Sequence, residues 1–314
     1  MRAAMAHTRG APLRLVEVPT PTPTGEEVLV RVRGAGVCHS DLRVTDDGLY
    51  PLPLILGHEI AGEVDGVGEV VVSIPWGCRR CRMCRFGIEG LCAEWTAPGF
   101  QRPGGYAEAV IVPSRDYLVP LEGLDPVAAA PLADAGATSY RALSRLRRTM
   151  LPGGRILIIG IGGLGQFAIQ WARLLTDATV IAVDIHASKR TAALELGAAE
   201  AVAPEELEGR FDGILDLVGT DETLALAARS LERHGSLVLV GGGAGSLRFS
   251  FELPRESTWT TTVGSTRADL ESVVAHARRG EVSWNIETLP LERAEEALRR
   301  LRDGTVVGRL VLTP

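Results

Sequence analysis

The sequence predicts a two-domain α/β protein, and three observations support this prediction. The chain has 314 residues, which is more than one hydrophobic core usually serves. Residues 1 to about 125 are rich in short β-type runs, glycines and prolines. Between about residues 136 and 264, strand-like apolar runs alternate with helical segments, which is typical of βαβ units on a parallel sheet.

The expected elements follow this division. A loop at residues 19–25 precedes strands at 28–32 and 107–112. The strands expected in the second part lie at residues 156–159, 180–183, 213–217 and 237–240. After residue 265 the expected elements are helices at 269–279 and 291–302 and a final strand at 309–312.

The composition excludes several classes of protein. With 46% hydrophobic and 23% charged residues, the chain has the composition of a globular protein. Its net charge is -6 and it has no basic stripe, which disfavours a zinc-ribbon nucleic-acid binder. There is no run of about 18 apolar residues, so we expect no membrane span. The N-terminus lacks a signal-peptide core, and five cysteines in a long chain favour metal binding in a reducing compartment, so we expect a cytoplasmic protein.

Four of the five cysteines fall within fifteen residues. They have the spacing C-x2-C-x2-C-x7-C and are Cys78, Cys81, Cys84 and Cys92. Four thiolates this close in sequence can converge on one tetrahedral Zn²⁺, and four protein ligands leave no position for a substrate. The spacing therefore predicts a structural zinc site.

The fifth cysteine belongs to a different motif. Cys38 begins the run Cys-His-Ser-Asp, and His58 follows twenty residues later in Gly57-His58-Glu59. One thiolate and one imidazole indicate a second zinc site with a position open to substrate. A closed and an open zinc site in one chain point to a zinc enzyme.

A glycine-rich loop indicates a dinucleotide site. The sequence G-x-G-x-x-G at residues 160–165 follows a strand pattern and opens a helix pattern at 166–175, as the dinucleotide fingerprint requires. Such glycines allow a tight turn and a close approach of backbone N–H groups to a pyrophosphate. Simple turn chemistry is the alternative. The candidate cofactor-binding residues here are Gly160, Gly162, Gly163, Leu164 and Gly165.

An acidic residue follows at the position that binds the ribose hydroxyls of NAD in dinucleotide-binding folds. Asp184 ends the next strand, nineteen residues after Gly165. A carboxylate there accepts the ribose hydroxyls of NAD and repels the 2′-phosphate of NADP. The alternative role for Asp184 is that of a plain helix cap.

Taken together, these motifs resemble the zinc-containing medium-chain alcohol dehydrogenases over nearly the whole chain. The resemblance implies a GroES-like β-rich catalytic domain at residues 1–135 and 265–314, which carries the structural zinc lobe at 78–92. It also implies a Rossmann domain, a doubly wound parallel sheet that binds NAD, at residues 136–264. The matching residues are 36–41, 57–59, the four clustered cysteines, 104–108, 160–165, Asp184 and 308–309.

The same resemblance implies the ligands of the catalytic zinc. They are Cys38, His58 and a third residue within 131–136, where many members have cysteine and this chain has Asp134. Aspartate is a competent zinc ligand, as in the bacterial and archaeal members that use it. The alternative is that Asp134 caps a helix near Thr138. Glu59 is implied as an alternating zinc ligand.

Further roles also come from the resemblance. Ser40 matches the hydroxyl that relays the alcohol proton, although Arg43 stands where the relay often ends in histidine. The remaining residues implied to bind the cofactor are His39 and Arg309 at the pyrophosphate, Lys189 at the adenosine ribose, and Thr138.

The resulting hypothesis is a zinc-dependent enzyme with two zinc ions per subunit. It would reversibly oxidise primary or secondary alcohols to aldehydes or ketones with NAD, as a homotetramer or, second, a dimer. The alternatives are a polyol or sugar dehydrogenase of the same superfamily and a non-catalytic zinc- and nucleotide-binding regulator. Four apolar side chains are either pocket walls that favour apolar alcohols or ordinary core: Leu49, Ile74, Trp76 and Trp95. The segment at 63–73 is also shorter than is usual in the family.

Overall fold

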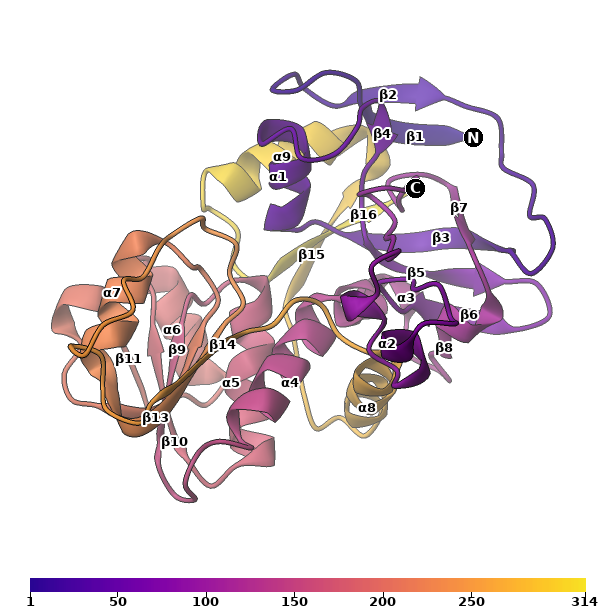
Figure 1. Ribbon diagram of the computed structural model, residues 1–314. Coiled ribbons are helices and arrows are strands. Elements are labelled where there is room, and N and C mark those ends of the chain that lie inside the picture. Colours follow the sequence, from indigo (N-terminus) through magenta and orange to yellow (C-terminus); the bar gives the residue numbers. More distant parts are fainter. The chain divides into compact units, whose positions relative to one another are not determined.

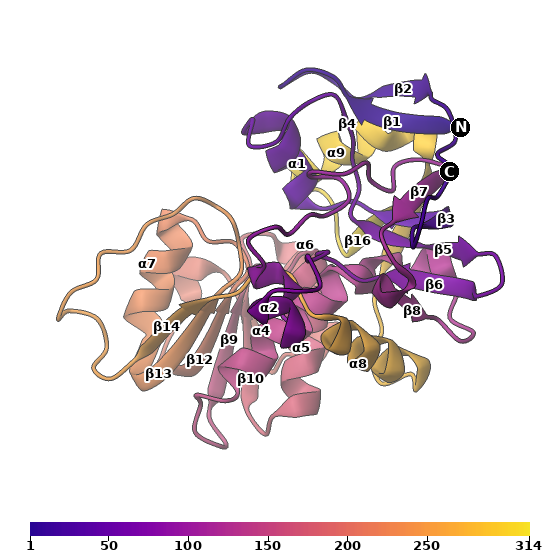
Figure 2. The same ribbon diagram turned by 45° about the vertical axis from the view of Figure 1, so that its right-hand side comes forward.

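The computed structural model describes residues 1–314 and divides into two compact units. The first unit comprises Met1–Ala137 and Gly264–Pro314, and the second comprises Thr138–Val263. The second unit is therefore inserted into the chain of the first. In Figures 1 and 2 the first unit contains both the indigo N-terminal segment and the yellow C-terminal segment. None of the helices combines the length and the apolar character that a membrane span requires.

The first unit is built on two β-sheets. The larger sheet has the order β15-β16-β3-β5-β6-β8, with β7 also paired to β3, and the smaller has the order β2-β1-β4. The strands of the larger sheet are β3 Val28–Gly36, β5 Glu59–Val64, β6 Gly68–Val72, β7 Ala109–Val112, β8 Leu118–Pro120, β15 Ile286–Pro290 and β16 Arg309–Thr313. Those of the smaller sheet are β1 Arg2–Ala6, β2 Arg14–Glu17 and β4 Leu54–Ile55.

Short helices surround these sheets. They are α1 His39–Asp46, α2 Arg82–Arg85, α3 Pro126–Ala129, α8 Arg267–Arg278 and α9 Ala294–Arg302. The α4 helix, Ala135–Leu146, starts in the first unit and continues into the second. The segment at 63–73 forms a tight β5–β6 hairpin in which only Asp65, Gly66 and Val67 lie between the strands.

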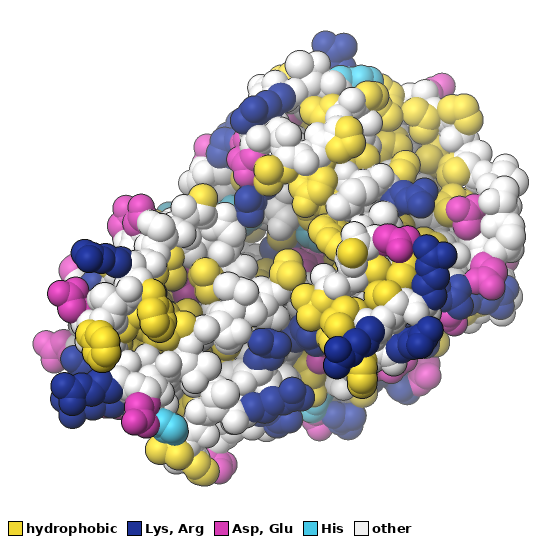
Figure 3. All heavy atoms as spheres, viewed as in Figure 1, with side chains coloured by type: hydrophobic (Ala, Val, Ile, Leu, Met, Phe, Trp, Pro, Cys, Tyr) yellow, Lys and Arg dark blue, Asp and Glu magenta, His cyan; other side chains and the backbone are white.

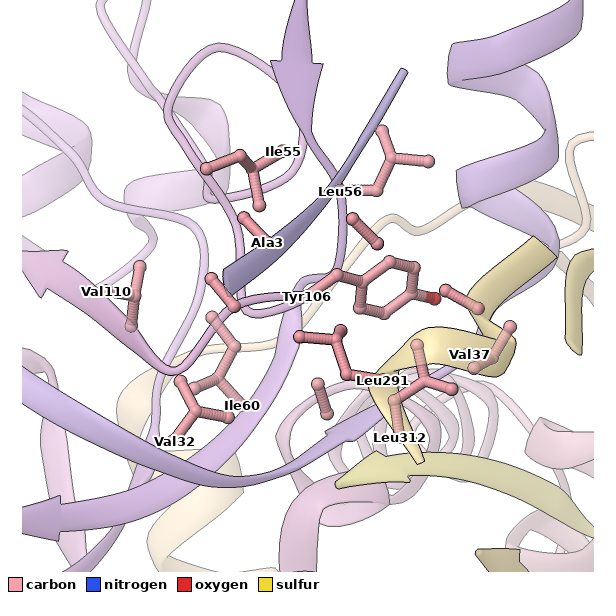
Figure 4. Packing of buried hydrophobic residues seen from close by; sticks show 14 of the residues in the cluster. Ala3, Val32, Val37, Ile55, Leu56, Ile60, Tyr106, Val110, Leu291 and Leu312 are labelled. Carbon is pink, nitrogen blue, oxygen red and sulfur yellow. The ribbon is translucent and has the colours of Figure 1, made fainter. Parts of the chain in front are cut away.

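The apolar core of the first unit joins segments that are distant in sequence. Figure 4 shows the ring of Tyr106 among apolar side chains that include Val37, Leu56 and Leu291, all of them 0 or 1% exposed. The N-terminal strand, the residues before β5 and the C-terminal strand all contribute to this cluster. Burial of these side chains is the main force that closes the two chain segments into one unit.

The second unit is a six-stranded, all-parallel sheet of order β11-β10-β9-β12-β13-β14. Its helices α5 and α7 pack against the strands, α5 on β9 and β10 and α7 on β12 and β13. Its strands are β9 Arg155–Ile159, β10 Thr179–Val183, β11 Glu200–Val202, β12 Phe211–Asp216, β13 Leu231–Leu239 and β14 Thr258–Thr261. Its helices after α4 are α5 Gly163–Leu175, α6 Ala187–Glu195 and α7 Asp221–Ser230.

This strand order places a crevice at a predictable point of the second unit. The order reverses between β9 and β12, and Ile159 lies in register with both Val183 and Asp216. The carboxyl ends of these three strands therefore form one edge, and ligands of such sheets bind there. The α/β class and parallel sheet predicted from the alternating pattern, and the doubly wound Rossmann sheet that the family resemblance implied, are confirmed.

Most expected elements are observed with ends shifted by a few residues, and two of the differences have a clear structural reason. The helix expected at 291–302 begins with a 3₁₀ turn, Leu291–Arg293, because Pro290 ends strand β15 immediately before it and the chain tightens into the helix. The strand expected at 237–240 starts earlier, at Leu231, because Leu231 pairs with Phe211 across an irregularity in the ladder. Neither difference moves a candidate site residue.

Candidate metal centres and nucleotide site

Three predicted ligands of the open zinc site come together at the ends of three elements. Cys38 is the N-cap of α1, His58 directly precedes β5, and Asp134 follows the 3₁₀ turn Ala130–Ala133. The Oδ2 atom of Asp134 lies 3.7 Å from Cys38 Sγ and 3.6 Å from His58 Nε2. Cys38 and His58 are buried, and Asp134 is partly exposed.

These separations fit a zinc ion. Ligand atoms at zinc bond lengths in a tetrahedron are separated by about 3.3–3.8 Å. The three donors are one thiol, one imidazole and one carboxylate, all of which bind Zn²⁺, and a fourth position is left for another molecule. Cys38, His58 and Asp134 could therefore hold a catalytic zinc.

Asp41, which was not among the predicted site residues, orients His58 from behind. Its Oδ1 lies 3.2 Å from His58 Nδ1, and its Oδ2 accepts hydrogen bonds from the Cys38 backbone N–H and the Tyr106 hydroxyl. Because both oxygens of Asp41 act as acceptors, Nδ1 carries the proton and Nε2 presents its lone pair to the metal site. Burial is the largest single effect and lowers the pKa of His58, but Asp41, Asp134 and Cys38 together outweigh it, so this pKa is well above its ordinary value. A metal ion at Nε2 would take the place of the second proton.

Glu59 is next to a metal ligand but is bound elsewhere in this structure. Its carboxylate forms a buried ion pair with Arg309 and accepts a hydrogen bond from the Ala135 N–H. Burial raises the pKa of Glu59, and Arg309 opposes that effect. Glu59 is not among the three residues whose ligand atoms cluster, and Arg309, which the resemblance implied at the pyrophosphate, is 3% exposed.

The predicted relay residue lies beside the same cluster. Ser40 Oγ is 3.8 Å from Cys38 Sγ and is partly exposed, whereas the adjacent His39 is exposed. Arg43, one turn later on α1, forms an ion pair with Asp47. Ser40 is thus placed at the metal centre.

The four clustered cysteines also converge. The Cys84 Sγ atom lies 3.5 Å from Cys81 Sγ and 4.0 Å from Cys78 Sγ, and backbone N–H groups point to the sulfurs of Cys78 and Cys92. These N–H groups lower the pKa of Cys78 to about 6, whereas burial raises the pKa of Cys84 to about 12. A zinc ion fits these separations, and coordination deprotonates a thiol outright.

Local geometry explains why the loop of the four cysteines can close. At Gly77 a Cβ would lie 2.5 Å from Cys84 Sγ, and Arg79 and Gly87 have positive φ angles. Figure 3 shows hydrophobic and basic side chains covering the surface where Figure 1 places α2. Four arginines lie among the first three cysteines and directly after them, and Arg79 and Arg80 are paired with carboxylates.

The glycine loop and Asp184 lie together in the second unit. Gly160 has a φ of 93°, and a Cβ on Gly165 would lie 2.4 Å from the Gly160 carbonyl oxygen, so both positions require glycine. Asp184 Oδ2 accepts a hydrogen bond of 2.8 Å from the Ile161 N–H, and Oδ1 accepts one of 2.9 Å from the His186 N–H. The acid is thus fixed against the loop that would hold a pyrophosphate.

The remaining predicted residues divide between surface and core. Lys189 is half-buried on α6, and Thr138 is buried on α4. Of the suggested pocket walls, Ile74 and Trp76 lie in the core of the first unit, and Leu49 is 60% exposed. Sequence reasoning did not identify the aromatic contact at the metal centre.

That contact comes from two residues in loops. The Phe100 ring lies 4.9 Å from the His58 ring and 5.2 Å from the Tyr50 ring, measured between centroids. A lone aromatic residue in a loop gives no periodic signal, so nothing in the sequence could have selected either residue.

Comparison with known proteins agrees with this geometry. Residues 24–123 match the family described as alcohol dehydrogenase GroES-like domain, and residues 163–279 match the family described as zinc-binding dehydrogenase. A D-arabinose 1-dehydrogenase (NADP(+)) from Saccharolobus solfataricus is 37% identical over 100% of this chain and 97% of its own length. An NAD-dependent alcohol dehydrogenase from Sulfurisphaera tokodaii is 35% identical, with 100% of both chains covered.

A solved structure shows the same likeness in three dimensions. The crystal structure of the alcohol dehydrogenase from Aeropyrum pernix has a TM-score of 0.93 at 32% identity, with 100% of both chains covered. The chain belongs to the zinc-containing medium-chain alcohol dehydrogenases. This confirms the predicted family, its GroES-like and Rossmann domain classes and its nature as an oxidoreductase.

We expect two zinc ions per subunit in undamaged protein by metal analysis. Cys38→Ala should lose one ion and all turnover while its circular dichroism stays unchanged, because Cys38 is a ligand at the open site. Cys81→Ala should lose the other ion and unfold at a lower temperature, because that ion closes a loop. Each variant is the control for the other. Full activity of Cys38→Ala would disprove the assignment of Cys38 as a ligand of the catalytic zinc.

Proposed function

We propose that this dehydrogenase oxidises small to medium apolar alcohols, primary or secondary, to aldehydes or ketones with NAD, and catalyses the reverse reaction. The observation that carries the proposal is the convergence of exactly one thiol, one imidazole and one carboxylate, which leaves an open zinc position. The protein is an NAD-linked zinc enzyme of its family.

The residues of the chain divide the work at this site. A bound zinc ion supplies a Lewis acid for the substrate oxygen, and NAD supplies the hydride acceptor. Cys38, His58 and Asp134 would hold the metal, and Asp41 fixes the ring orientation of His58. Ser40, beside Cys38, accepts the alcohol proton and passes it outward.

The apolar substrate class follows from the aromatic residues at the metal centre. The Phe100 ring lies tilted against His58, the Tyr50 ring lies tilted against Phe100, and the Phe100 ring offers no hydrogen-bonding group. A ring wall favours alkyl or aryl groups, whereas a polyol needs polar partners for each hydroxyl. The D-arabinose dehydrogenase relative keeps a sugar substrate as the second candidate. A non-catalytic regulator would not need a zinc position left open.

A substrate panel tests this proposal. With NAD, primary and secondary aliphatic and benzylic alcohols should give NADH absorbance, at a kcat/KM at least about tenfold above that for aldoses and polyols. A chelator should abolish the signal, and added Zn²⁺ should restore it, because the metal is required for turnover. Faster turnover of D-arabinose would favour the sugar alternative, and no turnover of any substrate would favour a regulator.

Cofactor preference depends on Asp184. Its carboxylate is anchored by two backbone N–H groups beside the glycine loop and lies where a ribose 2′-phosphate would bring like charge. Arg190 donates hydrogen bonds to the carbonyls of Asp184 and Ile185, so its charge reduces the repulsion, and Lys189 precedes it on the same helix. We therefore propose a preference for NAD instead of complete exclusion of NADP.

The ratio of kcat/KM for NAD to that for NADP should be on the order of 100. Asp184→Gly should raise the KM for NAD and bring the ratio close to one, because the ribose hydroxyls lose their acceptor. Asp177→Gly, at the turn after α5 in the same unit, is the matched control and should leave the ratio unchanged. Equal use of both cofactors by the wild type would refute this role for Asp184.

We also propose that the protein is a homotetramer, or second a dimer, in the cytoplasm. The loop between β13 and β14 has apolar residues at alternate positions, and two of them, Phe249 and Phe251, are 83% and 106% exposed. Hydrophobic side chains reach the surface at the left of Figure 3, where Figure 1 places this loop. Next to the edge strand β14, such a segment suits pairing with a second copy. The five free cysteines agree with a reducing compartment.

Light scattering should give a particle of several times 33.5 kDa for the wild type. Phe249→Ser with Phe251→Ser should shift the particle to a smaller mass, because the exposed apolar segment is lost. Leu151→Ser, at a 60% exposed position of the same unit outside this segment, should not. A wild-type mass of 33.5 kDa would exclude the proposed assembly.

A further inference from the structure

The fully buried hydroxyl of Tyr106 is hydrogen-bonded to the carboxylate of Asp41, which contacts His58 of the metal centre. Tyr106 is 0% exposed, and its Oη donates a hydrogen bond of 2.7 Å to Asp41 Oδ2. The ring is otherwise surrounded by apolar side chains, as Figure 4 shows. A hydroxyl in such surroundings is costly unless it is hydrogen-bonded, so its direction toward Asp41 is fixed.

The backbone brings this tyrosine beside the chain that leads to His58. Gly105 N–H donates to the Gly57 carbonyl and Tyr106 N–H donates to the Leu56 carbonyl, so the two segments run side by side. Gly57 has a φ of 92°, and a Cβ there would lie 2.4 Å from Tyr106 Cδ1. Glycine at position 57 is therefore what allows the ring to lie against the residue before His58.

The carboxylate of Asp41 depends on three donors. It is 0% exposed, and its recorded donors are the Cys38 N–H at 2.8 Å, the Tyr106 hydroxyl at 2.7 Å and the His58 ring at 3.2 Å. No arginine or lysine side chain bonds to it, so these three donors keep the carboxylate in position. Removal of one donor from a buried carboxylate both weakens it and allows it to turn.

We infer that Tyr106 is a positioning residue for the metal centre: it fixes Asp41, which in turn fixes the tautomer and the ring orientation of His58. The inference rests on the proposed function of the Cys38, His58 and Asp134 site. Partners behind a metal-bound histidine commonly change metal affinity by roughly 10- to 100-fold. The hydroxyl of Tyr106 does not touch His58 itself and acts through one oxygen of Asp41, so its effect should lie at the lower end of this range.

Tyr106→Phe tests the inference because it removes only the hydroxyl and keeps the ring in its apolar site. Co²⁺ in the open site reports its own ligand geometry by visible absorption, and its release to a chelator gives a rate. We expect about tenfold faster release from Tyr106→Phe and a shifted cobalt spectrum. The kcat should fall while the KM for NAD stays unchanged, since the nucleotide residues are untouched.

Tyr117→Phe is the matched control. Tyr117 is another buried tyrosine of the first unit, 5% exposed, whose hydroxyl bonds to the N–H and carbonyl of Gly77, beside the four-cysteine site. This variant should leave the cobalt spectrum and release rate of the open site unchanged. Equal effects of both substitutions on the open site would reduce the role of Tyr106 to general packing and overturn the inference.

A double-variant comparison separates action through Asp41 from direct action. If Tyr106 acts through Asp41, Asp41→Asn and Asp41→Asn/Tyr106→Phe should release cobalt at the same rate. Additive effects would overturn the inference. If Tyr106→Phe does not fold, 3-fluorotyrosine at position 106 keeps the hydroxyl and changes its donor strength; an unchanged cobalt spectrum would again overturn it.

The outcomes for Tyr106 and for the proposed function are distinguishable. Wild-type protein that binds no cobalt at Cys38, His58 and Asp134 would disprove the proposed metal centre itself. Wild-type protein that binds cobalt and oxidises alcohols, with release from Tyr106→Phe within twofold of wild type, would disprove only the role of Tyr106.

Discussion

The first unit is organised by the need to compensate charge that lies inside its core. Asp41, Glu59 and Arg309 are at most 3% exposed, and His58 is 2% exposed. A buried charge left without a partner costs about 3–5 kcal/mol when its partner is removed. Each of these groups therefore has a fixed neighbour: Arg309 for Glu59, and backbone, tyrosine and histidine donors for Asp41.

Because of this constraint, the positions of the metal ligands depend on the packing of the residues around them. Gly36 is needed because a Cβ there would lie 1.9 Å from Glu59 Oε2, and Gly57 is needed because of the Tyr106 ring. The absence of a side chain at these glycines thus allows the buried charged groups, and with them the metal ligands, to occupy their positions. In the second unit, the buried carboxylate of Asp184 is compensated by hydrogen bonds from backbone N–H groups instead of by an arginine side chain. The positive φ of Gly160 shapes the adjacent loop.

Sequence reasoning reached those features whose signal is local. The cysteine spacing and the glycine loop are short motifs. The structure brings the four thiols together and joins the backbone of the glycine loop to Asp184. Asp134 came only from resemblance, because it lies 96 residues from Cys38 and no periodicity marks it. Asp41 and Phe100 went unrecognised as partners of His58, and Tyr106 as a partner of Asp41, because these contacts depend on tertiary pairing. An example is the register of residues 104–106 with 55–57.

The insertion of one unit within the other also has a consequence during synthesis of the chain. Glu59 and its cationic partner Arg309 are 250 positions apart, so at typical translation speeds roughly 12 to 50 s pass between the emergence of the two residues. In that interval the whole of the second unit is made and its own contacts are all available. The nascent first unit must meanwhile leave Glu59 in contact with water, so its core is the last part of the protein to close.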